Sequence, residues 1–287
     1  MCPHGQEEVH LEKGFMSMEL FRKIINDVAR FQADVNLFMG GESLLHPQLI
    51  EMIKYMKQKE IPIRLYTNAT LLTPETSEEL INSGVDYIVF SFDGMNKEMY
   101  ENYRKGARFE KTLKNIRDFL AAKKMLKHKK PLIVIQCLEF KEFAHKPELR
   151  KQFKKLFDTK MVDAFTFIQP HSFGGACKDY SIVKDHRNYS PCAFLWYSMS
   201  VMWDGTVVPC CVDMFKRYPI GNVKEASLEE LWNSDKLAYL REKIYHGAYQ
   251  NIEPCSACDI LWKKKILGVP VKNIYNLIDM IRSRLKH

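Results

Sequence analysis

A chain of 287 residues with 46% hydrophobic and 27% charged residues has the composition of a globular protein with a sizeable core. No apolar run approaches the roughly 20 residues of a membrane span, and the polar N-terminus lacks a signal-peptide core, so we expect a cytoplasmic protein without a membrane partner. The net charge of +8 comes mainly from lysine runs at 123–130 and 263–265. Because aromatic residues do not interleave with these runs, they indicate solvated helix faces rather than a nucleic-acid interface.

The first 170 residues alternate between helical and strand-like hydrophobic patterns. We expect helices at 15–31, 47–59, 74–84, 109–125 and 147–156. We expect strands at 34–39, 63–67, 85–92, 132–138 and 164–169. This order predicts an α/β fold, in which a parallel sheet has helices on its outer face and binds ligands at the carboxyl ends of its strands. Periodicity alone does not distinguish a barrel from an open, doubly wound sheet.

Glycine and polar residues gather at the predicted carboxyl ends of these strands. They are Gly40-Gly41-Glu42, Thr67-Asn68, Ser91 and Asp93-Gly94. Glycine lets backbone carbonyls approach a ligand closely, and the Glu42 carboxylate beside the two glycines suits an ammonium group. A tight turn after a strand is the alternative interpretation of Gly-Gly-Glu.

The segment Met1-Cys2-Pro3 lies 38 residues before Gly40, counted from Cys2. With this spacing, residues 1–170 resemble the radical S-adenosylmethionine (radical SAM) core, a partial (β/α)6 TIM-like barrel with a Cys-x3-Cys-x2-Cys loop. The resemblance implies that Cys2 is the third cysteine of that loop, which holds a [4Fe–4S] cluster with one iron open to S-adenosylmethionine. The first two cysteines and the first strand would precede Met1. We therefore expect further coding sequence upstream and a barrel that lacks its first strand here.

The same resemblance assigns cofactor-binding roles to residues at the strand ends. The implied contacts of S-adenosylmethionine are Gly40, Gly41, Glu42, Asn68, Ser91, Asp93 and Arg104. Glu42 would meet the amino group, and Ser91 and Asp93 the ribose or carboxylate. Arg104 would pair with the carboxylate, although an ordinary surface arginine is an equal alternative. Asn68 lies in Thr-Asn-Ala, where the family usually has Thr-Asn-Gly. The sequence assigns no catalytic side chain.

Eight cysteines in such a chain favour metal binding or catalysis over a disulfide framework. Four of them follow the pattern Cys192-x12-Gly205-x4-Cys210 and then Cys255-x2-Cys258. The Asp-Gly pair at Gly205 predicts a hairpin turn that brings Cys192 and Cys210 together. By themselves these cysteines are also compatible with a zinc ribbon.

The pattern and the stretch between the cysteines resemble the SPASM type of auxiliary-cluster domain. The resemblance implies one auxiliary [4Fe–4S] cluster ligated by Cys192, Cys210, Cys255 and Cys258. We expect Cys137 to pack in the core. Cys211 is an alternative cluster ligand and Cys177 lies where substrate could pass, but for both an ordinary thiol is the favoured interpretation. We expect a core over 1–180, a small Cys-rich α+β SPASM domain over 181–265 and a C-terminal helix over 266–287.

The resemblance implies an enzyme that cleaves S-adenosylmethionine reductively to a 5′-deoxyadenosyl radical. The radical would abstract hydrogen from a peptide or a small molecule such as a sugar or alcohol. An electron donor such as flavodoxin or ferredoxin is the expected protein partner. Because Cys2 alone cannot hold a cluster, a non-catalytic iron–sulfur or zinc-binding protein is the competing hypothesis.

Overall fold

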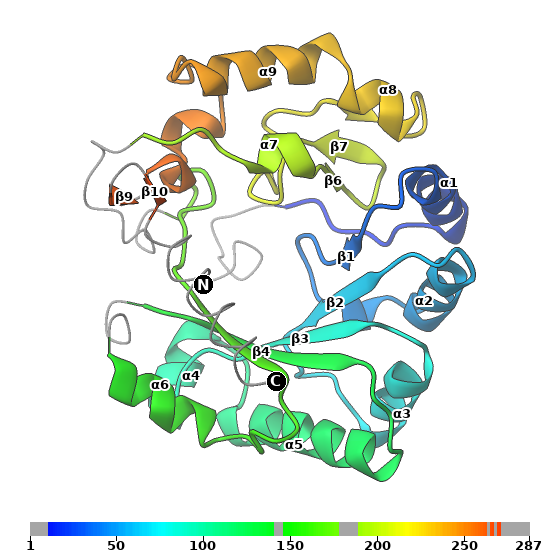
Figure 1. Cartoon of the computed structure of the whole chain (residues 1–287), viewed down its shortest axis with the longest axis vertical. Coiled ribbons are helices and arrows are strands. Elements are labelled where there is room, and N and C mark those ends of the chain that lie inside the picture. Colours follow the sequence, from blue (N-terminus) through cyan, green and yellow to red (C-terminus); the bar gives the residue numbers. More distant parts are fainter. Residues whose placement is uncertain (1–10, 141–145, 178–188, 263–264, 267–268, 271–287) are drawn as a thin grey trace.

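The computed structural model describes residues 11–140, 146–177, 189–262, 265–266 and 269–270. Its larger half is a five-stranded parallel sheet in the order β1-β2-β3-β4-β5, curved as part of a barrel (Figure 1). The strands are β1 (Val35–Leu37), β2 (Ile63–Thr67), β3 (Tyr87–Ser91), β4 (Leu132–Leu138) and β5 (Ala164–Ile168). Because all neighbours are parallel, their carboxyl ends lie along one edge. The predicted α/β class and parallel sheet are confirmed.

Helices connect these strands and cover the outer face of the sheet (Figure 1). They are η2 (Ser43–Leu45), α2 (Leu49–Gln58), α3 (Pro74–Asn82), α4 (Lys97–Tyr103), α5 (Phe109–Met125) and α6 (Pro147–Lys154). The sequence prediction missed α4, whose only buried side chain is Tyr100, so it has no helical hydrophobic pattern. An N-cap hydrogen bond from the Met99 amide to Asn96 is the local signal for this helix.

The main core lies between the sheet and these helices. Leu65, Ile88, Phe90 and Ile135 from the three central strands are fully buried. Burying a side chain of this size contributes about 1.5–3 kcal/mol, so these layers hold the strands firmly. The polar residues just beyond the strand ends are therefore presented by a rigid sheet.

The smaller half is built on a three-stranded antiparallel sheet of β6 (Ser200–Val201), β7 (Thr206–Val208) and β8 (Gly221–Asn222). The predicted hairpin joins β6 to β7, with Gly205 at a φ of +92° and the Thr206 amide bonded to the Asp204 side chain. The remaining helices are α7 (Phe194–Tyr197), α8 (Leu228–Trp232), α9 (Asp235–Tyr245), η4 (Cys255–Ala257) and η5 (Asp259–Leu261).

The helix α1 (Met18–Ala29) belongs to both halves (Figure 1). Phe21 and Ile25 pack into the main core, whereas Leu20 and Ile24 pack into the core of the smaller half. The Leu228 amide that opens α8 donates to Asp27 Oδ2 at 3.1 Å. This helix therefore ties the two halves together, a role that its hydrophobic pattern did not reveal.

Near the C-terminus, β9 (Lys265–Ile266) pairs antiparallel with β10 (Val269–Pro270). The predicted C-terminal helix therefore does not begin at 266, and its remainder, 271–287, lies outside the described residues. Cys2 and the lysines at 263 and 264 also lie outside them. Within the part of the chain that is described, every helix is too short or too polar to cross a membrane.

Candidate cofactor and cluster sites

The chain turns sharply after β1, at the predicted glycine pair. Met39 and Gly40 have φ values of +158° and +64°, and the turn leads directly into Glu42. A Cβ placed on Gly41 would meet no atom of the described residues within 4 Å. The turn therefore leaves one side of the backbone open to a ligand.

The half-buried carboxylate of Glu42 is held by three neutral donors. Oε1 accepts hydrogen bonds from the Thr67 hydroxyl at 2.6 Å and the Leu44 amide at 3.2 Å, and Oε2 accepts one from the Asn68 amide at 2.8 Å. These contacts fasten the loop after β1 to the end of β2. Among the described residues, no Lys, Arg or His forms an ion pair with Glu42. A carboxylate has about four acceptor positions, so one remains for a ligand.

Thr67 is a residue whose role the sequence analysis missed. It lies on the buried face of β2 with Ile63 and Leu65, and its exposed fraction is 2%. A buried hydroxyl requires a partner, and here the partner is Glu42. The period of two along β2 is the signal that could have identified it.

The turn after β2 keeps the conformation that glycine favours, although the chain has Thr-Asn-Ala in place of Thr-Asn-Gly. Ala69 has a φ of +61°, in the left-handed region that favours glycine. The Asn68 side-chain oxygen accepts from the Thr70 amide at 2.9 Å and the Thr70 hydroxyl at 2.6 Å, which closes the turn. Alanine in this conformation costs roughly 1–2 kcal/mol but keeps the same turn.

Beyond β3, Asp93 and Arg104 form a buried ion pair. Asp93 Oδ2 lies 2.6 Å from Arg104 Nη2, and Oδ1 accepts from the Leu138 amide at 2.7 Å. The Asp93 side chain is 1% exposed and that of Arg104 16%. Burial alone would lower the pKa of Arg104, but the Asp93 carboxylate outweighs burial and raises this pKa. Asp93 thus has partners within the protein for both oxygens.

The structure brings the predicted cofactor residues together in two groups. Glu42 contacts the Asn68 amide, and Asp93 contacts Arg104. Ser91 ends β3 and is half-buried, and β3 pairs directly with β2. The contact of each with a cofactor stays a prediction.

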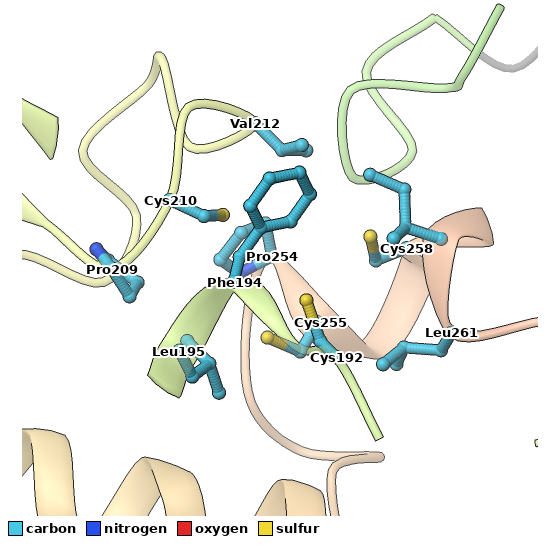
Figure 2. A pocket seen from close by; sticks show the side chains of 11 residues that line it. Cys192, Phe194, Leu195, Pro209, Cys210, Val212, Pro254, Cys255, Cys258 and Leu261 are labelled. Atoms are coloured by element: carbon cyan, nitrogen blue, oxygen red, sulfur yellow. The ribbon is translucent and has the colours of Figure 1, made fainter. Parts of the chain in front are cut away.

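In the smaller half, the four predicted cluster ligands line one pocket (Figure 2). Cys192 precedes α7, Cys210 follows β7, and Cys255 and Cys258 lie at the two ends of η4. Figure 2 shows their sulfur atoms pointing into the same space, beside the ring of Phe194. The rest of the lining is apolar, namely Phe194, Leu195, Pro209, Val212, Pro254, Ile260 and Leu261.

Burial in this pocket keeps the free cysteine thiols protonated. Burial raises the pKa of Cys255 and of Cys258 to about 12, and the neighbouring cysteines add to the shift. Burial likewise raises the pKa of Cys210. Thiolates form here only when a positive charge compensates them, as metal ligation does.

The donor set of the pocket consists of cysteines alone. Among the described residues, no three His, Cys, Asp or Glu side chains converge closely enough to hold one metal ion, as tetrahedral zinc requires. Four cysteines around an apolar pocket suit a [4Fe–4S] cluster, and their role as its ligands stays a prediction. Cys211 is not part of the lining, and Cys137 is fully buried in β4 as expected.

Two family models match the chain. The radical SAM superfamily matches residues 1–127, and the iron-sulfur cluster-binding domain SPASM matches residues 192–259. The chain is 27% identical to the tungsten-containing aldehyde ferredoxin oxidoreductase cofactor-modifying protein of Pyrococcus furiosus, over 91% of this chain and 90% of that protein. It is 22% identical to the PqqA peptide cyclase of Gluconobacter oxydans, over 90% of this chain and 78% of that one.

Solved structures show the same fold. BtrN in complex with AdoMet and 2-DOIA aligns with a TM-score of 0.60 at 16% identity, covering 90% of this chain and 85% of BtrN. SuiB of Streptococcus suis bound to S-adenosylmethionine aligns with a TM-score of 0.60 at 15% identity, covering 88% and 66%. With both family models matched, this chain is a radical SAM enzyme with a SPASM domain, and its cofactors are S-adenosylmethionine and [4Fe–4S] clusters.

Proposed function

We propose that this enzyme cleaves S-adenosylmethionine reductively and uses the 5′-deoxyadenosyl radical to abstract hydrogen from a peptide or small-molecule substrate. The observation that supports this proposal most strongly is the set of hydrogen-bond partners of Glu42. Its carboxylate is fixed by three neutral donors, has no cationic partner among the described residues, and borders the open turn at Gly41. An ammonium group would supply the cationic partner that Glu42 lacks among the described residues.

The residues of this chain would bind and orient the cofactor. Glu42 would accept a hydrogen bond from the amino group of S-adenosylmethionine through its remaining acceptor position. Asp93 would hold the Arg104 guanidinium in place for the cofactor carboxylate, since it already bonds both Nε and Nη2. When bound, the [4Fe–4S] cluster of the core supplies one electron to the cofactor. Cys2 as a ligand of that cluster stays a prediction.

A peptide is the substrate class to test first. The PqqA peptide cyclase acts on a peptide by its name, and SuiB has been crystallised with its precursor peptide SuiA. The P. furiosus relative is named for the modification of a cofactor, which supports a small molecule as the other class. A flavodoxin or ferredoxin would supply the electrons.

The substitution Glu42→Gln tests the amino-group site. It keeps one acceptor oxygen and the shape of the side chain but removes the charge. We expect a tenfold to hundredfold weaker affinity for S-adenosylmethionine, because a hydrogen bond to a charged group contributes about 1.5–3 kcal/mol. Calorimetric titration of the anaerobically reconstituted protein measures this loss.

Glu51→Gln is the matched control, because Glu51 is an exposed residue of α2 paired with Arg22. It should bind the cofactor as the wild type does. Equal affinity in Glu42→Gln would contradict the role of Glu42. A wild-type protein that binds no S-adenosylmethionine would favour the non-catalytic hypothesis instead.

The proposed ligands of the auxiliary cluster need a separate test. Cys258→Ala should remove the iron of that cluster, about four atoms per protein, and leave cofactor binding intact. Cys137→Ala is the control, because it removes another buried thiol that lies in β4 rather than in the pocket. The iron and zinc contents of Cys258→Ala and Cys137→Ala are measured by metal analysis. Tightly bound zinc in place of iron would overturn the cluster assignment.

A further inference from the structure

The chain that leaves β5 runs from the sheet to the cluster-binding half, where residues 172–177 form a loop (Figure 1). We call residues 172–177 the β5 loop. Its first amide, that of Ser172, donates to Asp259 Oδ2 at 2.8 Å. Asp259 directly follows Cys258, a proposed cluster ligand. One end of the loop is therefore bonded to the residue that directly follows the ligand segment 255–258.

Two glycines let the loop lie directly against that segment. A Cβ on Gly174 would lie 2.6 Å from Pro254 Cβ, and a Cβ on Gly175 would lie 2.7 Å from Ala257 Cβ. Both distances are far below van der Waals contact. No side chain larger than hydrogen fits without moving the residues on either side of Cys255.

Arg217 ties the same loop to the other ligand segment. Arg217 lies in the connection between β7 and β8, which also carries Cys210. Its Nη1 donates to the Gly174 carbonyl at 2.9 Å and its Nη2 to the Phe173 carbonyl at 2.8 Å. The fully buried Asp213 holds the base of this connection by accepting from the Arg217 amide at 2.9 Å.

These contacts are costly to break, because the charged groups have few other partners. Asp259 is 7% exposed, and its second oxygen, Oδ1, has no hydrogen-bond partner among the described residues. The Nε of Arg217 is also buried without one. If the β5 loop moved away, the buried Asp259 carboxylate would lose its hydrogen bond, and the half-buried Arg217 guanidinium would keep its 3.9 Å ion pair with Asp213 but lose both hydrogen bonds to the loop. These hydrogen bonds therefore join the loop to both ligand segments.

We propose that Arg217 and Asp259 are positioning residues that couple the β5 loop to the auxiliary cluster. The loop holds the two ligand segments at the spacing that the cluster needs, and a bound cluster in turn fixes the loop. Because coupling is reciprocal, the cluster stabilises the position of the loop by the same free energy by which the loop stabilises the bound cluster. His171 enters the loop from β5, with its ring 4.3 Å from that of Phe173, so the cluster also fixes a side chain near the carboxyl end of the sheet. The inference rests on the cluster assignment and not on the proposed reaction.

Hydrogen exchange measures the effect of the cluster on the loop. In iron-loaded wild-type protein, the amides of Ser172, Gly175 and Cys177 should exchange about tenfold more slowly than in the iron-free protein. Each of these amides donates a hydrogen bond within the loop or to Asp259. Equal exchange rates in the two forms would overturn the proposal.

The rate of iron loss to a chelator measures the effect of the loop on the cluster. Arg217→Met and Asp259→Ala should each lose the auxiliary iron about tenfold faster than the wild type, since each removes hydrogen bonds between a charged side chain and the β5 loop. Asp259→Asn keeps an acceptor for the Ser172 amide and should stay close to the wild-type rate. If Arg217→Met does not fold, the difference in iron loss between Asp259→Ala and Asp259→Asn still tests the proposal.

Arg30→Met is the matched control, because Arg30 also joins the two halves, through an exposed ion pair with Glu229 at 3.3 Å. It should retain iron as the wild type does. Iron loss at the control rate in both Arg217→Met and Asp259→Ala would overturn the proposal. Affinity for S-adenosylmethionine should be unchanged in all these variants, so failure here is distinct from failure at Glu42.

Discussion

Asp86, at the amino end of β3, and Glu42, beyond the carboxyl end of β1, each accept three hydrogen bonds from the described residues. The donors to Asp86 are the Lys130 ammonium, the Lys57 ammonium at 3.0 Å and the Ile63 amide at 3.0 Å. The donors to Glu42 are two amides and a hydroxyl. Two lysines neutralise the first carboxylate, whereas the second has only neutral donors among the described residues.

This difference agrees with the different roles of the two strand ends in barrel-like folds. Polar residues at the amino ends of parallel strands stabilise the fold, whereas those at the carboxyl ends bind ligands. Asp93 shows that position alone does not decide the role. It lies at the carboxyl end of β3, yet Arg104 neutralises it as lysines neutralise Asp86. The partners of a carboxylate therefore indicate its role better than its place in the sheet.

The largest expected effect comes from removing the carboxylate of Asp93. Asp93→Ala leaves the mostly buried Arg104 guanidinium without its partner and the Leu138 amide without an acceptor. Breaking a buried ion pair in this way costs about 3–5 kcal/mol of unfolding free energy. Urea denaturation of the wild type and of Asp93→Ala measures this loss of unfolding free energy.

Asp118→Ala is the control for Asp93→Ala. It breaks an ion pair with Lys114 on the surface of α5, where the Asp118 side chain is 51% exposed. Such pairs contribute about 0–1 kcal/mol. A loss of stability in Asp93→Ala no larger than in this control would show that Asp93 and Arg104 are not a structural pair.

A smaller loss is expected at the amino end of the sheet. Asp86→Ala removes a carboxylate that bonds two lysines and the buried Ile63 amide, which should cost about 2 kcal/mol of unfolding free energy. Its affinity for S-adenosylmethionine should be unchanged, the reverse of the expectation for Glu42→Gln. Denaturation and calorimetric titration of both variants measure the contrast. A weaker cofactor affinity in Asp86→Ala would contradict it.

The sequence predicted what depends on local pattern. The bounds of β2, α5 and β4 agree with the expected segments, because each has a clear period and distinct ends. The resemblance of the cysteine pattern to a SPASM domain implied the four cysteines that line the pocket. These features require only the order of residues along the chain.

The sequence could not predict contacts between distant segments. Asp259 and Ser172 are separated by 87 positions, and no local pattern marks either as a partner of the other. Nor does the composition of α1 reveal that its apolar residues divide between two cores. Such contacts depend on how the two halves pack, which the spacing of hydrophobic residues does not encode.

The smallest expected effect is a pH dependence at Asp86. Burial alone would raise the pKa of this carboxyl, but hydrogen bonds from Lys130, Ile63 and Lys57 outweigh burial and lower it. A lowered pKa in the folded state stabilises the protein fully above the unfolded pKa of about 3.9, and that stability is lost as pH falls through the folded pKa. The difference in unfolding free energy between wild type and Asp86→Asn should therefore shrink from about pH 6 to about pH 3.

Urea denaturation at several pH values measures this difference. Asp118→Asn is the exposed control, and its difference from the wild type should be small at every pH. A difference for Asp86→Asn that widened at low pH would show that the lysines do not neutralise Asp86, and the contrast with Glu42 would lose its basis.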